Sequence, residues 1–166
     1  MILGMSTATY TFLHVLISLI GIGSGLIVMY GLLTGKRMDL LTAVFLATTV
    51  LTSVTGFGFP FDHLLPSHKV GILSLIILAV AIPARYLFHL AGWWRWIYVV
   101  GAALALYFNV FVLVVQAFLK IPALKALAPT QTEPAFVVAQ LLVLLVFATL
   151  AIFATIRFHP ERLRTA

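Results

Sequence analysis

Cysteine is absent from the 166 residues, and charged side chains are scarce. Without a thiol the chain forms no disulfide, offers no thiolate to zinc or to an iron–sulfur cluster, and has no cysteine nucleophile. Charged residues make up 8% of the chain, whereas about a quarter of the residues of a soluble domain are charged. The sequence also has no Gly-rich phosphate loop, nucleophile elbow or zinc-type His-Glu motif. These absences exclude an ordinary soluble domain, and whether the protein is an enzyme stays uncertain, with a non-enzymatic role favoured.

Long apolar runs take the place of the missing charges. The segments 1–35, 40–61, 96–119 and 134–156 carry no charged residue. About 20 apolar residues are enough to cross a hydrocarbon core of about 30 Å as a helix. We therefore predict an all-α, polytopic membrane protein with one transmembrane domain over 1–166. Its five transmembrane helices are expected at about 9–33, 39–57, 67–88, 97–119 and 133–158.

The ends of these runs carry residues typical of a membrane interface. The N-terminus lacks the basic region of a signal peptide, so we expect the first run to be retained as the first span. Pro83 predicts a kink in the third span, and Arg85 is expected to extend to the headgroups. The Trp-Trp-Arg-Trp stretch at 93–96 is typical of an aromatic belt. The segment 123–128, between two prolines, predicts one turn of interfacial helix.

The positions of lysine and arginine predict the orientation. Basic residues accumulate on the cytoplasmic side of a membrane protein. If the N-terminus is outside, seven basic residues lie inside and three lie outside, which predicts an outer N-terminus and an inner C-terminus. The seven are Lys36, Arg37, Arg85, Arg95, Arg157, Arg162 and Arg164, and the three are Lys69, Lys120 and Lys125.

Polar side chains within the predicted spans lie mainly in the outer half. At a rise of 1.5 Å per residue, His14 lies about two turns below the outer surface, and Asn109 lies near mid-membrane. Gln116 and Gln140 fall closer to the outer face. Because an ionisable residue is costly to keep in hydrocarbon, His14 carries the most functional weight. We predict an outward-facing polar pocket formed by these four residues.

The connection between the second and third spans lies above the same half of the membrane. Asp62 and His63 in this connection are therefore added to the predicted pocket. The inner halves of the spans are almost wholly apolar and offer no relay for a proton across the membrane. A purely structural interpretation remains open, in which the polar groups only join helices and the Gly21-x-x-x-Gly25 spacing only permits close packing.

Three hypotheses for the function follow. The first is a non-enzymatic component that binds or transports a small molecule, a lipid or a proton in the polar pocket. The second is a redox subunit that binds b-type haem or a quinone, with His14 and His68 as axial ligands on the outer side; no cofactor at all is the favoured expectation. The third is an accessory or scaffold subunit that forms a homo-oligomer or joins a larger membrane complex through the Gly21/Gly25 face. No hypothesis involves nucleic acid, and the lipid bilayer is the expected partner.

Several stretches of the sequence resemble a known group of proteins. They are Thr-Gly-Phe-Gly-Phe-Pro-Phe-Asp-His-Leu-Leu-Pro-Ser-His from 55, Ala-Arg-Tyr-Leu-Phe-His-Leu-Ala-Gly-Trp-Trp-Arg-Trp-Ile-Tyr from 84, and Tyr-Phe-Asn-Val-Phe-Val-Leu-Val-Val-Gln from 107. With Ala-Pro-Thr-Gln-Thr-Glu-Pro from 128, they are similar to a group of small uncharacterised bacterial multi-span inner-membrane proteins. The resemblance implies a bacterial inner (plasma) membrane location and no mechanism.

Overall fold

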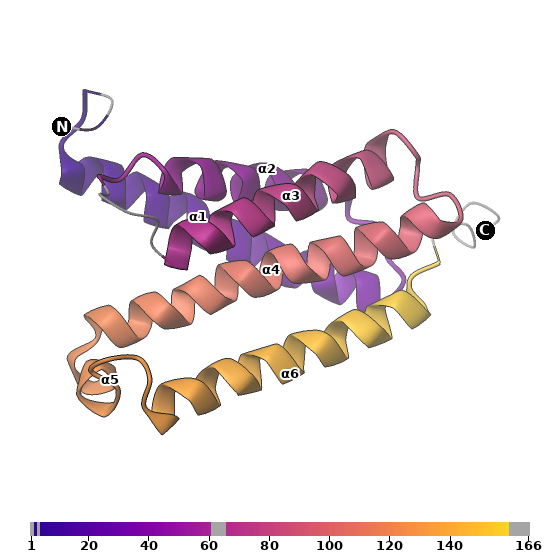
Figure 1. Cartoon of the computed structure of the whole chain (residues 1–166). Coiled ribbons are helices and arrows are strands. Elements are labelled where there is room, and N and C mark those ends of the chain that lie inside the picture. The colour runs from indigo at the N-terminus through magenta and orange to yellow at the C-terminus, as the bar shows by residue number, and fades with distance from the viewer. Residues whose placement is uncertain (1, 3, 61–65, 160–166) are drawn as a thin grey trace.

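The described part of the chain consists of helices joined by short connections. The computed structural model describes residues 2, 4–60 and 66–159, in which there are six helices and no extended strand (Figure 1). Five of them are long and apolar enough to cross a membrane, which confirms the predicted all-α fold with five helices of transmembrane length and composition. The helices are α1 (Thr7–Leu33), α2 (Asp39–Gly56), α3 (Pro66–Tyr86), α4 (Trp93–Lys120), α5 (Pro122–Leu127) and α6 (Pro134–Arg157).

Local chemistry explains where the helices begin and end. The hydroxyl of Ser6 accepts a hydrogen bond from the backbone N–H of Thr9 at 3.1 Å and so caps α1. Gly35 follows this helix at a φ of +72°, a conformation that glycine adopts readily. Helix α4 begins four residues earlier than predicted, because Gly92, at a φ of +53°, turns the chain directly into the tryptophan-rich stretch. The aromatic residues at 93–96 thus form the first turn of a long helix.

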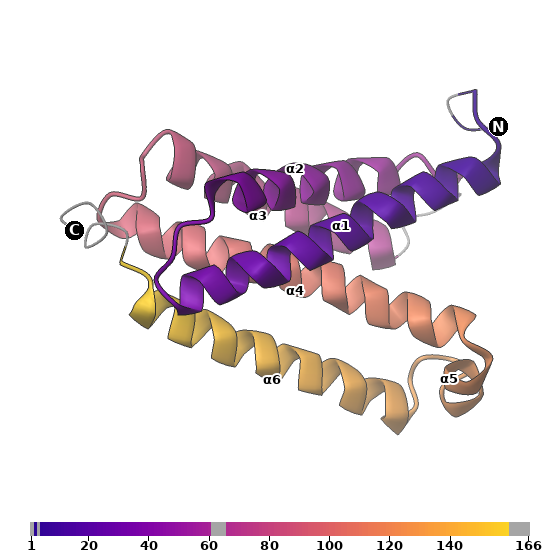
Figure 2. The same ribbon diagram turned by 180° about the vertical axis from the view of Figure 1, so that it is seen from behind.

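The helices run side by side with α4 at the centre (Figures 1 and 2). Helices α1, α2, α3 and α4 form a bundle, and α6 packs along α4 and approaches α1 near their C-terminal ends. Short helix α5 lies in the connection between α4 and α6. Helix α1 begins at one end of the bundle, and α6 ends at the opposite end.

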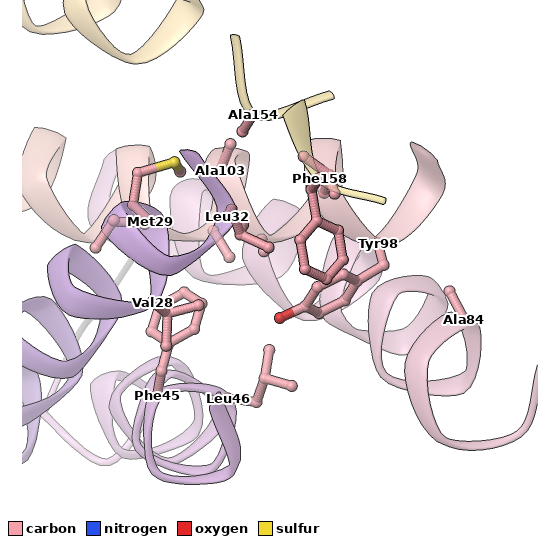
Figure 3. Packing of buried hydrophobic residues seen from close by; sticks show 14 of the residues in the cluster. Val28, Met29, Leu32, Phe45, Leu46, Ala84, Tyr98, Ala103, Ala154 and Phe158 are labelled. Carbon is pink, nitrogen blue, oxygen red and sulfur yellow. The ribbon is translucent and has the colours of Figure 1, made fainter. Parts of the chain in front are cut away.

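One end of the bundle is tightly packed, and we call it the core end. Its buried apolar residues come from the C-terminal halves of α1, α3 and α6 and from the N-terminal halves of α2 and α4 (Figure 3). Gly25 permits this packing, because a Cβ atom there would lie 2.6 Å from Leu106 Cδ1 and 2.8 Å from the Phe45 ring. The labelled members of this cluster are Val28, Met29, Leu32, Phe45, Leu46, Ala84, Tyr98, Ala103, Ala154 and Phe158.

Much of the apolar surface outside the core end faces outward. Helix α6 has only two buried residues, Phe147 and Ala154, and its Leu145 side chain is 63% exposed. A soluble protein rarely exposes apolar area on this scale, whereas lipid chains are a suitable environment for it. The exposed faces agree with helices that lie in a bilayer.

Arg85 and the glycines of α1 have surroundings that the sequence did not predict. Arg85 does not extend to the surface: it is 4% exposed and forms an ion pair with Asp39 at the start of α2. The guanidinium of Arg85 can stay buried because the carboxylate of Asp39 pairs with its charge. Gly21 and Gly25 are buried against α2 and α4. These two glycines of α1 therefore pack against helices of the same chain.

Candidate functional site

A cavity of about 630 Å³ lies among α1, α2, α3 and α4 at the end of the bundle opposite the core end. We call this the cavity end. The surface of its wall is mainly apolar, and all four helices also contribute polar residues to the lining. The polar residues are Thr11, His14 and Ser18 on α1, Thr52 and Ser53 on α2, Ser67, His68 and Ser74 on α3, and Asn109, Gln116 and Lys120 on α4.

His14 is fixed on one wall of the cavity by a contact with α2. Its Nδ1 atom lies 2.8 Å from Thr55 Oγ1. Its ring also packs edge-on against Phe59, with 5.2 Å between the ring centroids. A hydrogen bond and an aromatic contact together hold the imidazole in one orientation, as a ligand-binding side chain requires.

Tyr10 stabilises the C-terminal end of α2 beside His14. Its hydroxyl donates a hydrogen bond to the backbone carbonyl of Thr55 at 2.7 Å. This approach depends on Gly58, because a Cβ atom at that position would lie 2.0 Å from the Tyr10 hydroxyl oxygen. Glycine near the end of α2 therefore serves the site by admitting a side chain from α1.

The hydroxyl groups of the membrane-length helices differ in whether they have a hydrogen-bond partner. Ser18 and Thr48 donate to the backbone carbonyls four residues earlier, both at 2.7 Å. The hydroxyl oxygens of Thr52 and Ser74 are buried and have no hydrogen-bond partner within the described part of the chain. A buried polar atom without a partner costs free energy, and such atoms are uncommon in native structures. Both residues line the cavity, but the two hydroxyl oxygens themselves are buried and do not open into it.

Asn109 links α4 to α2 at the deep end of the cavity. Its side-chain amide donates to Thr49 Oγ1 at 3.1 Å, and Thr49 is fully buried. Gln116 lines the cavity further along α4, and Lys120 lies beyond it at the last turn. The structure therefore brings three of the predicted pocket residues, His14, Asn109 and Gln116, to one cavity.

The other predicted pocket residues are not part of this cavity as described. Gln140 on α6 donates to the backbone carbonyl of Phe111 at 3.2 Å and does not line the cavity. Helix α6 packs against another face of α4, so equal depth in the membrane did not bring Gln140 to the same place. Asp62 and His63 lie outside the described residues.

His68, the second predicted haem ligand, does line the cavity. It is buried, and its ring stacks on Phe57 with 5.4 Å between centroids. Among residues 2, 4–60 and 66–159, no group of three or more histidine or acidic side chains is placed to hold a metal ion.

Sequence reasoning missed several parts of the site. The roles of Phe57 and Phe59 depend on how the chain folds back after α2, which no local motif indicates. The sequence pattern indicates Lys120 only as a charge that reports orientation, whereas the structure places it in the cavity lining. At the core end, Arg85 lies 5.1 Å from the centre of the Tyr98 ring in addition to its ion pair with Asp39. An arginine within a predicted span was the one signal for that contact.

Comparisons of this chain with protein-family models, with curated proteins and with solved structures gave no match.

Proposed function

We propose that this protein binds a small, largely apolar molecule in the cavity, as a non-enzymatic binding or transport component of a bacterial inner membrane. The observation that carries the proposal is a cavity whose wall contains His14, an imidazole held in place by Thr55 and Phe59. A ligand with a polar group can bind to this imidazole, while the rest of the ligand lies against the apolar lining.

The size and lining of the cavity suit this class of ligand. Small-molecule sites commonly measure about 300–1,000 Å³ and have apolar walls with a few placed polar groups. The volume of about 630 Å³ and the mainly apolar lining fall within this description. A molecule that already dissolves in the bilayer gains orientation and hydrogen bonds from such a site.

The test is to identify what the purified protein retains. Protein purified in a mild detergent is extracted with organic solvent, and the extract is analysed by mass spectrometry. We expect one class of small molecule at a near-stoichiometric amount in the wild type and its loss in Ser74→Phe, which fills the cavity. Leu145→Phe, on the exposed face of α6, is the matched control and should retain it. If Ser74→Phe and the wild type give the same extract while both remain folded, the cavity is not the binding site.

The same preparation separates the alternatives. A haem held by His14 and His68 would give a Soret band in the absorption spectrum, and our proposal expects none. A scaffold subunit would co-purify with a larger complex, whereas a self-sufficient binding protein should be isolated without other chains. Either contrary result would replace the proposal with the corresponding alternative.

We also propose that the cavity end faces the periplasm, with the C-terminus in the cytoplasm. The support is the excess of basic residues at the core end. The chain has no natural cysteine, so single cysteines can be introduced without background. A membrane-impermeant maleimide added to cells with a permeable outer membrane should label Lys125→Cys readily. It should label Lys36→Cys only after the inner membrane is opened, and the reverse pattern would invert the orientation.

A further inference from the structure

The hydrogen bonds around Thr55 determine which nitrogen of His14 carries a proton. The Thr55 hydroxyl lies 2.7 Å from the backbone carbonyl of Leu51, which can only accept. Thr55 must therefore donate its single hydroxyl proton to Leu51. The same oxygen lies 2.8 Å from His14 Nδ1, so His14 donates to it through Nδ1–H. In the neutral imidazole, Nε2 is consequently an acceptor.

His14 Nε2 is available to a ligand. Among the described residues, the hydrogen bond of the ring uses Nδ1, the aromatic contact is the edge-on packing with Phe59, and Nε2 makes no hydrogen bond. The residue lines the cavity. A fixed acceptor in an apolar cavity selects for a donor, because two acceptors placed together would leave both unsatisfied.

A ligand hydroxyl is able to donate to His14 Nε2. A lone carbonyl or ether oxygen can only accept.

We propose that the ligand of this cavity is a membrane-soluble alcohol or phenol whose hydroxyl donates to His14 Nε2 and whose apolar body lies against the walls of α1 and α4. This inference rests on the proposed function and defines the class of its ligand. Thr55 is a positioning residue in this arrangement, since it acts by fixing the proton on His14 Nδ1.

The test uses two probes that differ only in the donor. 4-Octylphenol carries a hydroxyl, and 4-octylanisole replaces it with a methyl ether of similar size and lipid solubility. Each is added at the same mole fraction to protein in lipid nanodiscs, and the apparent dissociation constant is measured from the shift in unfolding temperature. We expect the phenol to bind roughly tenfold more tightly, as the loss of one hydrogen bond to a buried acceptor predicts.

Substitutions at Thr55 check the cause of this selectivity. Thr55→Val removes the acceptor for Nδ1–H and lets the proton move to Nε2, so the phenol-to-anisole ratio should fall to about twofold or less. Thr55→Ser keeps the hydroxyl and should keep the ratio. His14→Phe should abolish the ratio while leaving weak binding of both probes. Because the ratio is already measured on the wild type, a variant that fails to fold does not remove the test.

The possible results separate this inference from the proposed function. Equal binding of the two probes to the wild type, sensitive to Ser74→Phe, would overturn the donor assignment and retain the cavity as a binding site. Tighter binding of the anisole would likewise overturn it. Binding of neither probe, together with no small molecule in the extract of the purified protein, would overturn the proposed function itself.

Discussion

Arg85 on α3 forms an ion pair with Asp39 on α2, although the Arg85 side chain is 3% exposed and that of Asp39 is 68% exposed. The pair joins the end of one helix to the start of another at the core end. Its two members differ in environment, because the cation is inside the bundle and the carboxylate reaches it from the surface. Removing the exposed partner therefore affects the buried one most.

Asp39→Asn should destabilise the protein. The change leaves a buried guanidinium without its ionic partner, and we expect a loss of about 1–3 kcal/mol, below the range for a fully buried pair because water screens Asp39. The measurement is the free energy of unfolding in a detergent titration. Arg37→Met removes the second, exposed partner of Asp39 at 3.2 Å and should cost less than about 0.5 kcal/mol. Equal losses in the two variants would contradict the role of burial.

Gly25→Ala should weaken the core end. The added methyl would meet Leu106 and Phe45, both of which are buried in the cluster, so we expect a cost of about 1–3 kcal/mol from overpacking. Gly23→Ala is the matched control on the same helix, because no atom lies within 4 Å of the added Cβ. It should be neutral or stabilise the helix by up to about 1 kcal/mol. Thermal unfolding of the two variants in one detergent distinguishes them, and a similar effect at both positions would refute the packing argument.

Gly58→Ala should disturb the cavity end through Tyr10. The new Cβ atom and the Tyr10 hydroxyl cannot occupy the same space, so the hydrogen bond from Tyr10 to the Thr55 carbonyl is expected to break. We predict a loss of about 1–3 kcal/mol in the free energy of unfolding. Tyr10→Phe alone should cost about 1 kcal/mol, and the double variant should be more stable than the sum of the two losses implies. Strict additivity would show that the two residues do not interact.

Glu133 should make the connection before α6 sensitive to acid. Slight burial raises the pKa of this carboxyl, but the backbone N–H of its own residue and hydrogen bonds from Thr130 and Thr132 together hold the pKa below its ordinary value. A lowered pKa means that these contacts stabilise the fold above the unfolded pKa and are lost as the pH falls through the folded one. The protection of the Thr130 and Thr132 amides against hydrogen exchange, relative to their intrinsic rates at the same pH, should therefore fall only in that acidic range. In Glu133→Gln, which lacks the titrating carboxyl, the protection of these two amides should not change over the same pH range. If the variant still loses protection in acid, the acid sensitivity belongs to another group.

The helices of this protein were predictable because their environment imposes a simple rule. A run of apolar residues long enough to cross a bilayer must satisfy its own backbone as a helix, so the spans and most of their ends follow from composition. The rise of the helix predicted similar depths for His14, Asn109 and Gln116, and the structure places all three in the wall of one cavity. Which helix faces which did not follow, since depth is a distance along one axis only. Gln140 shows this, because it has a similar predicted depth but lies on a helix that contacts another face of α4.

The pairing of polar groups also lay beyond the sequence. Arg85 was expected at the headgroups because a lone arginine usually extends there, and its burial depends on Asp39, which is far away in the chain. Likewise, Thr52 and Thr55 are the same residue type on the same helix. The Thr52 hydroxyl has no hydrogen-bond partner among the described residues, whereas the Thr55 hydroxyl contacts His14. These differences arise from rotamers and from the neighbouring helices, which a one-dimensional pattern does not encode.

The bundle is closely packed at the core end and contains a cavity at the other end. The side chains around Phe45, Leu106 and Tyr98 hold the helices together at the core end. Because close packing resists rearrangement, we expect a change in the spacing of the helices to occur first at the cavity end, where it would alter the width of the cavity.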